Sequence, residues 1–180
     1  HFLLNYCADT PLVHTPISIL EGPRERGYAS LPKFFNDMVR LSQADIFMCG
    51  NDDMVFLTVG WVELMLEAAA KYPDGLFDIG VETYNKEVIP FSVVSRKLVD
   101  CLGFINDERL LWSDLYLSDI MRQFGRIERL PIAIVHEWTG LTNERGEARE
   151  HEQRLVYSDA DKYWALHKQC VQEAVDKIRH

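Results

Sequence analysis

A short apolar run over residues 46 to 49 is followed at once by a glycine and, two residues later, by a pair of carboxylates. The run has the length of a buried strand, and Gly50 indicates that the chain turns just before Asp52 and Asp53. In open α/β sheets, ligands collect beyond the carboxyl ends of the strands. Carboxylate oxygens in that place suit Mg²⁺ or Mn²⁺, and an acidic surface turn is the alternative interpretation. The run therefore predicts a sheet with a candidate metal site at its edge.

Predicted strands and helices alternate along the chain. Apolar runs predict strands over residues 2 to 7, 46 to 49, 76 to 81, 91 to 94 and 127 to 135. Helical spacing and end signals predict helices over residues 31 to 39, 61 to 70, 95 to 103, 113 to 125 and 158 to 178. Pro131 interrupts the last strand and places it at a bulge or an edge. The pattern is that of a mixed α/β domain with a helical tail.

Particular residues mark several of the helix ends. Ser95 is the predicted cap of one helix, and Gly103 is its terminator. Ser158 with Asp161 resembles a capping arrangement for the last helix. The polar, charge-rich residues 139 to 154 before that helix are predicted to be flexible.

Composition limits the partners of this chain. The 180 residues, 47% of them hydrophobic, fit one globular domain. A formal net charge of −9 argues against non-specific binding to nucleic acid or to an anionic lipid surface. A phosphate-bearing ligand would need a metal or a local basic cluster, and Arg24 and Arg26 form the best such cluster, with a solvated charged loop as the alternative. No apolar run approaches the roughly 18 residues of a membrane-spanning helix. We expect a cytoplasmic protein, either free or peripheral at a membrane.

The four cysteines lack CxxC spacing. They are Cys7, Cys49, Cys101 and Cys170. Cys49 and Cys101 lie in apolar patterns that are typical of buried free thiols. The sequence therefore argues against disulfides and against a zinc site, and it favours a reducing compartment.

Asp114 lies in the first turn of a predicted helix. The helix dipole and the unpaired amides there favour the ionised carboxylate. Asp114 is therefore predicted to accept a proton at neutral pH, and simple helix capping is the alternative.

Two further residue types could complete a site. His136 ends an apolar strand, where its imidazole could join Asp52 and Asp53 around a metal or hold a phosphate; a histidine bonded to a carbonyl is equally compatible. Trp112 and Trp138 could stack on a sugar or base ring, or could simply pack in the core. No GxGxxG motif, P-loop or nucleophile motif is present.

Taken in chain order, these pieces resemble the second and third quarters of a GT-A fold glycosyltransferase, in particular the family 2-like enzymes that use nucleotide-sugar donors. The segment Asn51-Asp52-Asp53 is similar to the DxD motif of that family, and Ser113-Asp114-Leu115-Tyr116-Leu117 is similar to its ED-x-x-L motif. The resemblance covers about residues 24 to 138. It departs from the family pattern at Asn51 and Ser113, and in an N-terminal nucleotide-binding part that is largely lacking or shortened.

The resemblance implies a role for each matching residue. Asp53 would ligate Mn²⁺ or Mg²⁺, Asp52 would contact the metal or the ribose, and His136 would be a late ligand of the metal or the diphosphate. Asp114 would deprotonate an acceptor hydroxyl. Implied donor-binding residues besides Asp52 are Arg24, Arg26, Asn36 and Trp112. The implied reaction is inverting transfer of a sugar from a nucleotide-sugar, a UDP-sugar foremost, to a carbohydrate or other hydroxyl acceptor.

The implied architecture is one GT-A-like domain over residues 1–180, with a Rossmann-like mixed sheet flanked by helices. Residues 1–50 would be a partial donor-binding half, residues 51–138 the metal motif and acceptor half, and residues 139–180 a flexible loop and C-terminal helix. That helix has a broad apolar face, which could cap the domain or pair two copies into a homodimer. Two other functions fit the residues: a nucleotidyltransferase on a similar sheet, and a non-catalytic binding module derived from a truncated glycosyltransferase.

Overall fold

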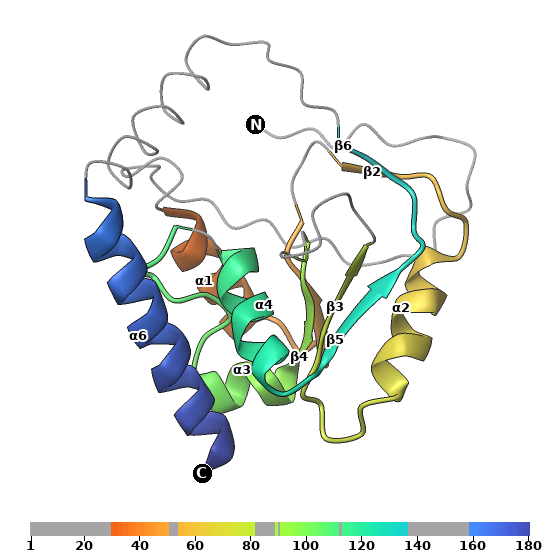
Figure 1. Ribbon diagram of the computed structural model, residues 1–180. Helices are drawn as coiled ribbons and strands as arrows, with labels where there is room; N and C mark the ends of the chain where they lie inside the picture. Colours follow the sequence, from red (N-terminus) through yellow and green to blue (C-terminus); the bar gives the residue numbers. More distant parts are fainter. Residues whose placement is uncertain (1–29, 51–53, 82–88, 90, 112, 137–158) are drawn as a thin grey trace, which may run out of the picture.

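The computed structural model describes residues 30–50, 54–81, 89, 91–111, 113–136 and 159–180. Four short strands in this part of the chain form a mixed sheet in the order β1-β4-β3-β5. These strands are β1 (Ile46–Met48), β3 (Asp78–Val81), β4 (Val93–Ser95) and β5 (Ile127–Leu130). β4 runs antiparallel to both of its neighbours, whereas β3 and β5 pair in parallel. β1, β3 and β5 therefore point the same way and end at one edge of the sheet (Figure 1).

A second, two-stranded sheet pairs β2 (Met54–Phe56) with β6 (Ile134–His136) in antiparallel orientation. The single strand predicted over residues 127 to 135 is thus wrong, because this stretch forms two strands in two sheets. Pro131 has no N–H to contribute to a ladder, and the Ile132 amide donates back to the Leu130 carbonyl at 2.8 Å. The chain leaves the first sheet at this turn and begins a new pairing.

Helices cover both faces of the four-stranded sheet (Figure 1). α2 (Trp61–Ala70) packs on one face, in a cluster that includes Ile79 and Val93. The opposite face is covered by α1 (Leu31–Leu41), α3 (Arg96–Leu102), α4 (Ser113–Gln123) and α6 (Ala160–Arg179). Side chains alternate along a strand, so Val94 points into this second cluster while its neighbour Val93 points toward α2. The prediction of a mixed α/β fold that ends in a helix is confirmed.

The ends of α3 are those that the sequence predicted. The Ser95 hydroxyl accepts a hydrogen bond from the Leu98 amide at 3.0 Å, and Gly103 adopts the left-handed conformation with φ of 86°. A side chain there would be strained, which is why glycine closes the helix.

The start of α6 corrects the predicted cap. Asp159 is the capping residue, and its carboxylate accepts from the Lys162 amide at 3.3 Å. Asp161 lies instead in the first helical turn, and Ser158 lies outside the described residues. The predicted strand over residues 2 to 7 and the predicted flexible segment 139 to 154 are also outside them.

The cysteines differ from one another in burial. Cys49 is half-buried, Cys170 is buried and Cys101 is exposed; these three are free thiols, and Cys7 lies outside the described residues. The predicted burial of Cys101 is therefore wrong. The packed side of α3 carries Leu98, Val99 and Leu102, while Cys101 lies at the rim of the α3–α6 contact. No helix in the described part of the chain is long and apolar enough to cross a membrane.

Arg96 ties the end of α1 to the start of α3. Its guanidinium donates to the backbone carbonyls of Val39, Ser42 and Ala44 at 3.2, 2.6 and 3.2 Å. The same group lies 4.5 Å from the centroid of the Phe47 ring. The last carbonyls of a helix have no partner within the helix, so a cation that caps them also suits the helix dipole.

We expect Arg96→Ala to lower the free energy of unfolding by about 2 to 4 kcal/mol, because several backbone carbonyls lose a charged donor at once. Urea denaturation followed by circular dichroism measures this change. Lys168→Ala, at an exposed position of α6, is the control. Equal urea midpoints for the two variants would contradict the assigned role of Arg96.

Candidate functional site

Cys49 and Gly50 follow β1, and Pro131 follows β5, at the edge of the sheet where β1, β3 and β5 end. β1 runs through Cys49 and Gly50 toward the acidic motif, whose own residues lie outside the described part. β5 runs through the turn at Pro131 into β6. The edge is thus where the sequence placed the candidate site, and ligands of open α/β sheets bind at this edge.

The register between β2 and β6 links two of the predicted metal-site segments. Met54 pairs with His136, Val55 with Val135 and Phe56 with Ile134. Met54 is the residue that directly follows Asp53 in the chain. Residues opposite each other in an antiparallel pair have Cα atoms only about 4.5 to 5.5 Å apart. His136 is therefore held beside the chain neighbour of the acidic motif.

Asp114 lies in the first turn of α4 and is half-buried. One of its carboxylate oxygens accepts from the Leu115 amide at 2.9 Å. Burial raises the pKa of Asp114, and hydrogen bonds from the backbone amides of residues 114 and 115 only partly offset that rise. The sequence predicted that the helix start favours the ionised carboxylate; the backbone hydrogen bonds act in that direction, and burial acts against them. A carboxylate with a raised pKa is the stronger base.

Asp78 is a fully buried carboxyl group that the sequence did not single out. It lies at the start of β3 and faces α4, where its Oδ2 accepts from the Ser118 hydroxyl at 3.1 Å. Its Oδ1 has no hydrogen-bond partner among the described residues. Burial raises the pKa of Asp78 to about 7, the Ser92 and Ser118 hydroxyls lower it, and the charge of Asp114 raises it further. The signal in the sequence that could have identified Asp78 is its place as an acid inside the apolar run 76 to 81.

Cys49 directly follows β1, and its thiol is influenced by both carboxyl groups. Burial raises the pKa of its thiol to about 12, and the charges of Asp78 and Asp114 raise it further. Such a thiol stays protonated at neutral pH, so Cys49 is not an activated nucleophile. Because the charges of Asp78 and Asp114 both act on this thiol, we refer to Cys49, Asp78 and Asp114 as the polar cluster.

Asn36 binds the loop before α4 from its place on α1. Its side-chain oxygen accepts from the amides of Ile105 and Asn106, both at 3.0 Å, and its nitrogen donates to the Asn106 carbonyl at 2.8 Å. Asn36 is buried, and these bonds fix the loop that leads to α4. The amide atoms of the buried Asn106 side chain have no hydrogen-bond partner among the described residues. Asn36, predicted as a donor-binding residue, thus has a backbone-binding role here.

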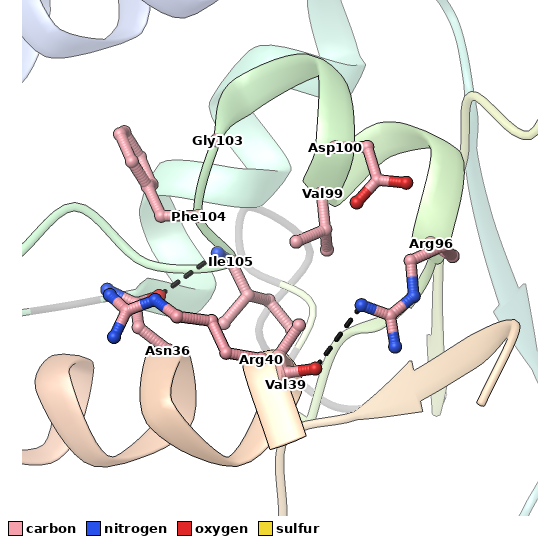
Figure 2. A pocket seen from close by; sticks show the side chains of 9 residues that line it. All are labelled: Asn36, Val39, Arg40, Arg96, Val99, Asp100, Gly103, Phe104 and Ile105. Carbon is pink, nitrogen blue, oxygen red and sulfur yellow. Dashed lines mark hydrogen bonds between the residues drawn. The ribbon is translucent and has the colours of Figure 1, made fainter. Parts of the chain in front are cut away.

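A shallow pocket of about 200 Å³ lies between α1 and α3 (Figure 2). Asn36 and Arg96 line it, and both side chains are engaged with backbone groups. Arg40, also at its wall, is exposed and pairs with Asp37. We therefore interpret this pocket as a gap in the packing of α1 against α3 and not as a ligand-binding site.

Several predicted site residues lie outside the described part of the chain: Arg24, Arg26, Asp52, Asp53, Trp112 and Trp138. Only the backbone of His136 is described. Within the described residues, no group of three or more His, Cys, Asp or Glu side chains could hold a metal ion.

Comparison with protein-family models, with curated proteins and with solved structures finds no match for this chain.

The buried Asp78 predicts a particular pH dependence of stability. Its pKa is about 7 in the folded protein and about 3.9 in an unfolded chain. Between these values the folded protein holds a proton that the unfolded chain has released, so the free energy of unfolding falls as pH rises from about 4 to 7. Asp78→Asn cannot titrate and should lose less stability between pH 5 and pH 8 than the wild type.

Urea denaturation at the two pH values measures the difference, which is on the order of a few kcal/mol at most. Asp45→Asn, at an exposed carboxylate, should keep the wild-type dependence. The same pH dependence in Asp78→Asn as in the wild type would show that Asp78 is not a buried titrating group.

Proposed function

We propose that this chain is a metal-dependent glycosyltransferase that moves a sugar from a nucleotide-sugar to an acceptor hydroxyl. The pairing of Met54 with His136 is the observation that carries the proposal, because it brings the segment after the DxD-like motif beside the late histidine. A mixed sheet flanked by helices, with a C-terminal helix, is compatible with the GT-A-like architecture implied by the resemblance.

The candidate metal ligands are Asp52, Asp53 and His136. Carboxylate and imidazole groups are ligands that Mn²⁺ accepts, and the carboxylates also suit Mg²⁺. A bound ion would neutralise the charge that develops on the departing nucleoside diphosphate. Arg24 and Arg26 are the candidate cations for the diphosphate, and Trp112 is the candidate stacking surface for the donor.

Asp114 is the candidate base. Its raised pKa and its place at the start of α4, in the polar cluster, suit a group that takes a proton from an acceptor hydroxyl. The acceptor oxygen would then bond to the anomeric carbon as the bond to the diphosphate breaks on the opposite face. The proton ends on Asp114, and the sugar inverts its configuration. Asn36 contributes indirectly, by fixing the loop that leads to α4.

Nucleotide binding tests the donor half of the proposal. The melting temperature of the protein should rise with UDP in the presence of Mn²⁺ and should rise less without the metal. Asp53→Ala should abolish the metal-dependent part, whereas Asp45→Asn should retain it. GDP, CMP and dTDP in parallel identify the base that the site accepts. A folded protein with no metal-dependent response to any of the four would contradict a working donor site and would favour the binding-module alternative.

Turnover tests the acceptor half. With a UDP-sugar, Mn²⁺ and a panel of hydroxyl acceptors, Asp114→Asn should lower kcat about 10²- to 10⁴-fold, because the variant loses its general base. Its nucleotide-induced rise in melting temperature should persist. Unchanged kcat in Asp114→Asn would exclude it as the base, and release of pyrophosphate from a nucleoside triphosphate would indicate a nucleotidyltransferase instead.

A further inference from the structure

The buried carboxyl group of Asp78 lies against the same face of α4 as the candidate base. Asp114 and Ser118 are four residues apart on α4, so their side chains project from one face of the helix, one turn apart. The Ser118 hydroxyl donates to Asp78 Oδ2 at 3.1 Å and accepts from the Ile89 amide at 3.0 Å. Ser118 thereby fastens α4 to β3 one turn below Asp114.

The charged and titratable groups around Asp78 come from three elements. The charge of Asp114 on α4 raises the pKa of Asp78, Arg129 on β5 lowers it, and the charge of Asp78 in turn acts on Cys49 after β1. Burial raises the pKa of Cys49 to about 12, so that thiol is uncharged at neutral pH. Asp114 and Asp78 are therefore the two groups here that compete to carry a negative charge. Asp78 is fully buried and Asp114 only half-buried, so desolvation disfavours the charge more strongly on Asp78.

We propose that Asp78 is a positioning residue for Asp114 that works as a neutral carboxylic acid, so that the two groups together carry one negative charge, on Asp114. This inference depends on the proposed role of Asp114 as the base. With Asp78 neutral, Ser118 can hold α4 in place without a second charge beneath the base. When Asp78 ionises, two like charges share a buried site, and their repulsion works against the position of Asp114.

Carboxyl titration of the unmodified protein tests the inference without any turnover. In protein labelled with ¹³C-aspartate, Asp114 should titrate at lower pH than Asp78, and the Asp114 resonance should show a second inflection at the midpoint of Asp78. Asp114→Asn should move the Asp78 midpoint to lower pH, because the neighbouring charge is gone. Ser118→Ala should move it to higher pH, because the Asp78 carboxylate loses a hydrogen-bond donor.

A single-step Asp114 curve in the wild type, together with an Asp78 midpoint that Asp114→Asn leaves in place, would overturn the inference. These titration experiments do not depend on catalysis, so their results hold even if no glycosyl transfer is found. Glycosyl transfer that depends on Asp114, found in a protein whose Asp78 and Asp114 titrate independently, would overturn only the inference about Asp78. The proposed function would remain intact.

The pH profile adds a readout that a purely structural residue would not move. If Asp78 works in its neutral form, wild-type kcat/KM should fall as Asp78 ionises, and Asp78→Asn should lack this alkaline limb. The ratio of kcat/KM at pH 8 to that at pH 6 should therefore be about tenfold higher in Asp78→Asn than in the wild type, as expected one unit either side of a single ionisation near pH 7. Asp45→Asn should keep the wild-type ratio, and the same ratio in Asp78→Asn would overturn the inference.

Discussion

The parallel pairing of β3 with β5 is the constraint on which the rest of the structure depends. Four residue pairs, from Asp78–Ile127 to Val81–Leu130, fix the two strands in register, so both strands end at the same edge of the sheet. Parallel strands need a long connection, and β4, α3 and α4 supply it here, which places α4 over the sheet. The end of β5 then leads into β6 and so brings His136 to Met54.

The pairing of β3 with β5 also buries the carboxyl group of Asp78 beneath α4, which costs stability. Asp78 opens β3 and is buried with one oxygen unpaired among the described residues, which works against stability whenever the group is charged. A hydrophobic residue of similar size would avoid this penalty. The hydrogen bond from Ser118, one helical turn from Asp114, is the basis for proposing that this costly carboxyl group is a neutral positioning residue for the candidate base. Stability and the proposed chemistry therefore oppose each other within one polar cluster.

Features set by short-range signals could be predicted from the sequence. The bounds of α2 follow from helical spacing and from the turn residues after it, and the ends of α3 follow from Ser95 and Gly103. Features set by distant partners could not be predicted. The burial of Asp78, the exposure of Cys101 and the occupation of the Asn36 amide by the loop before α4 each depend on what packs against the residue. His136 was predicted, from its place at the end of an apolar strand, as a possible partner of Asp52 and Asp53; the structure pairs it with Met54, the residue after Asp53, and the metal site stays a prediction.

We propose that a divalent cation binds where β2 meets β6. The most direct test is the selective broadening of backbone amide resonances by Mn²⁺ in the presence of UDP, measured in ¹⁵N-labelled protein. We predict that Met54 and His136 broaden first, that α6 is unaffected, and that Asp53→Ala abolishes the effect at the same Mn²⁺ concentration. Broadening that spares Met54 and His136, or that persists in Asp53→Ala, would contradict a metal site at this edge.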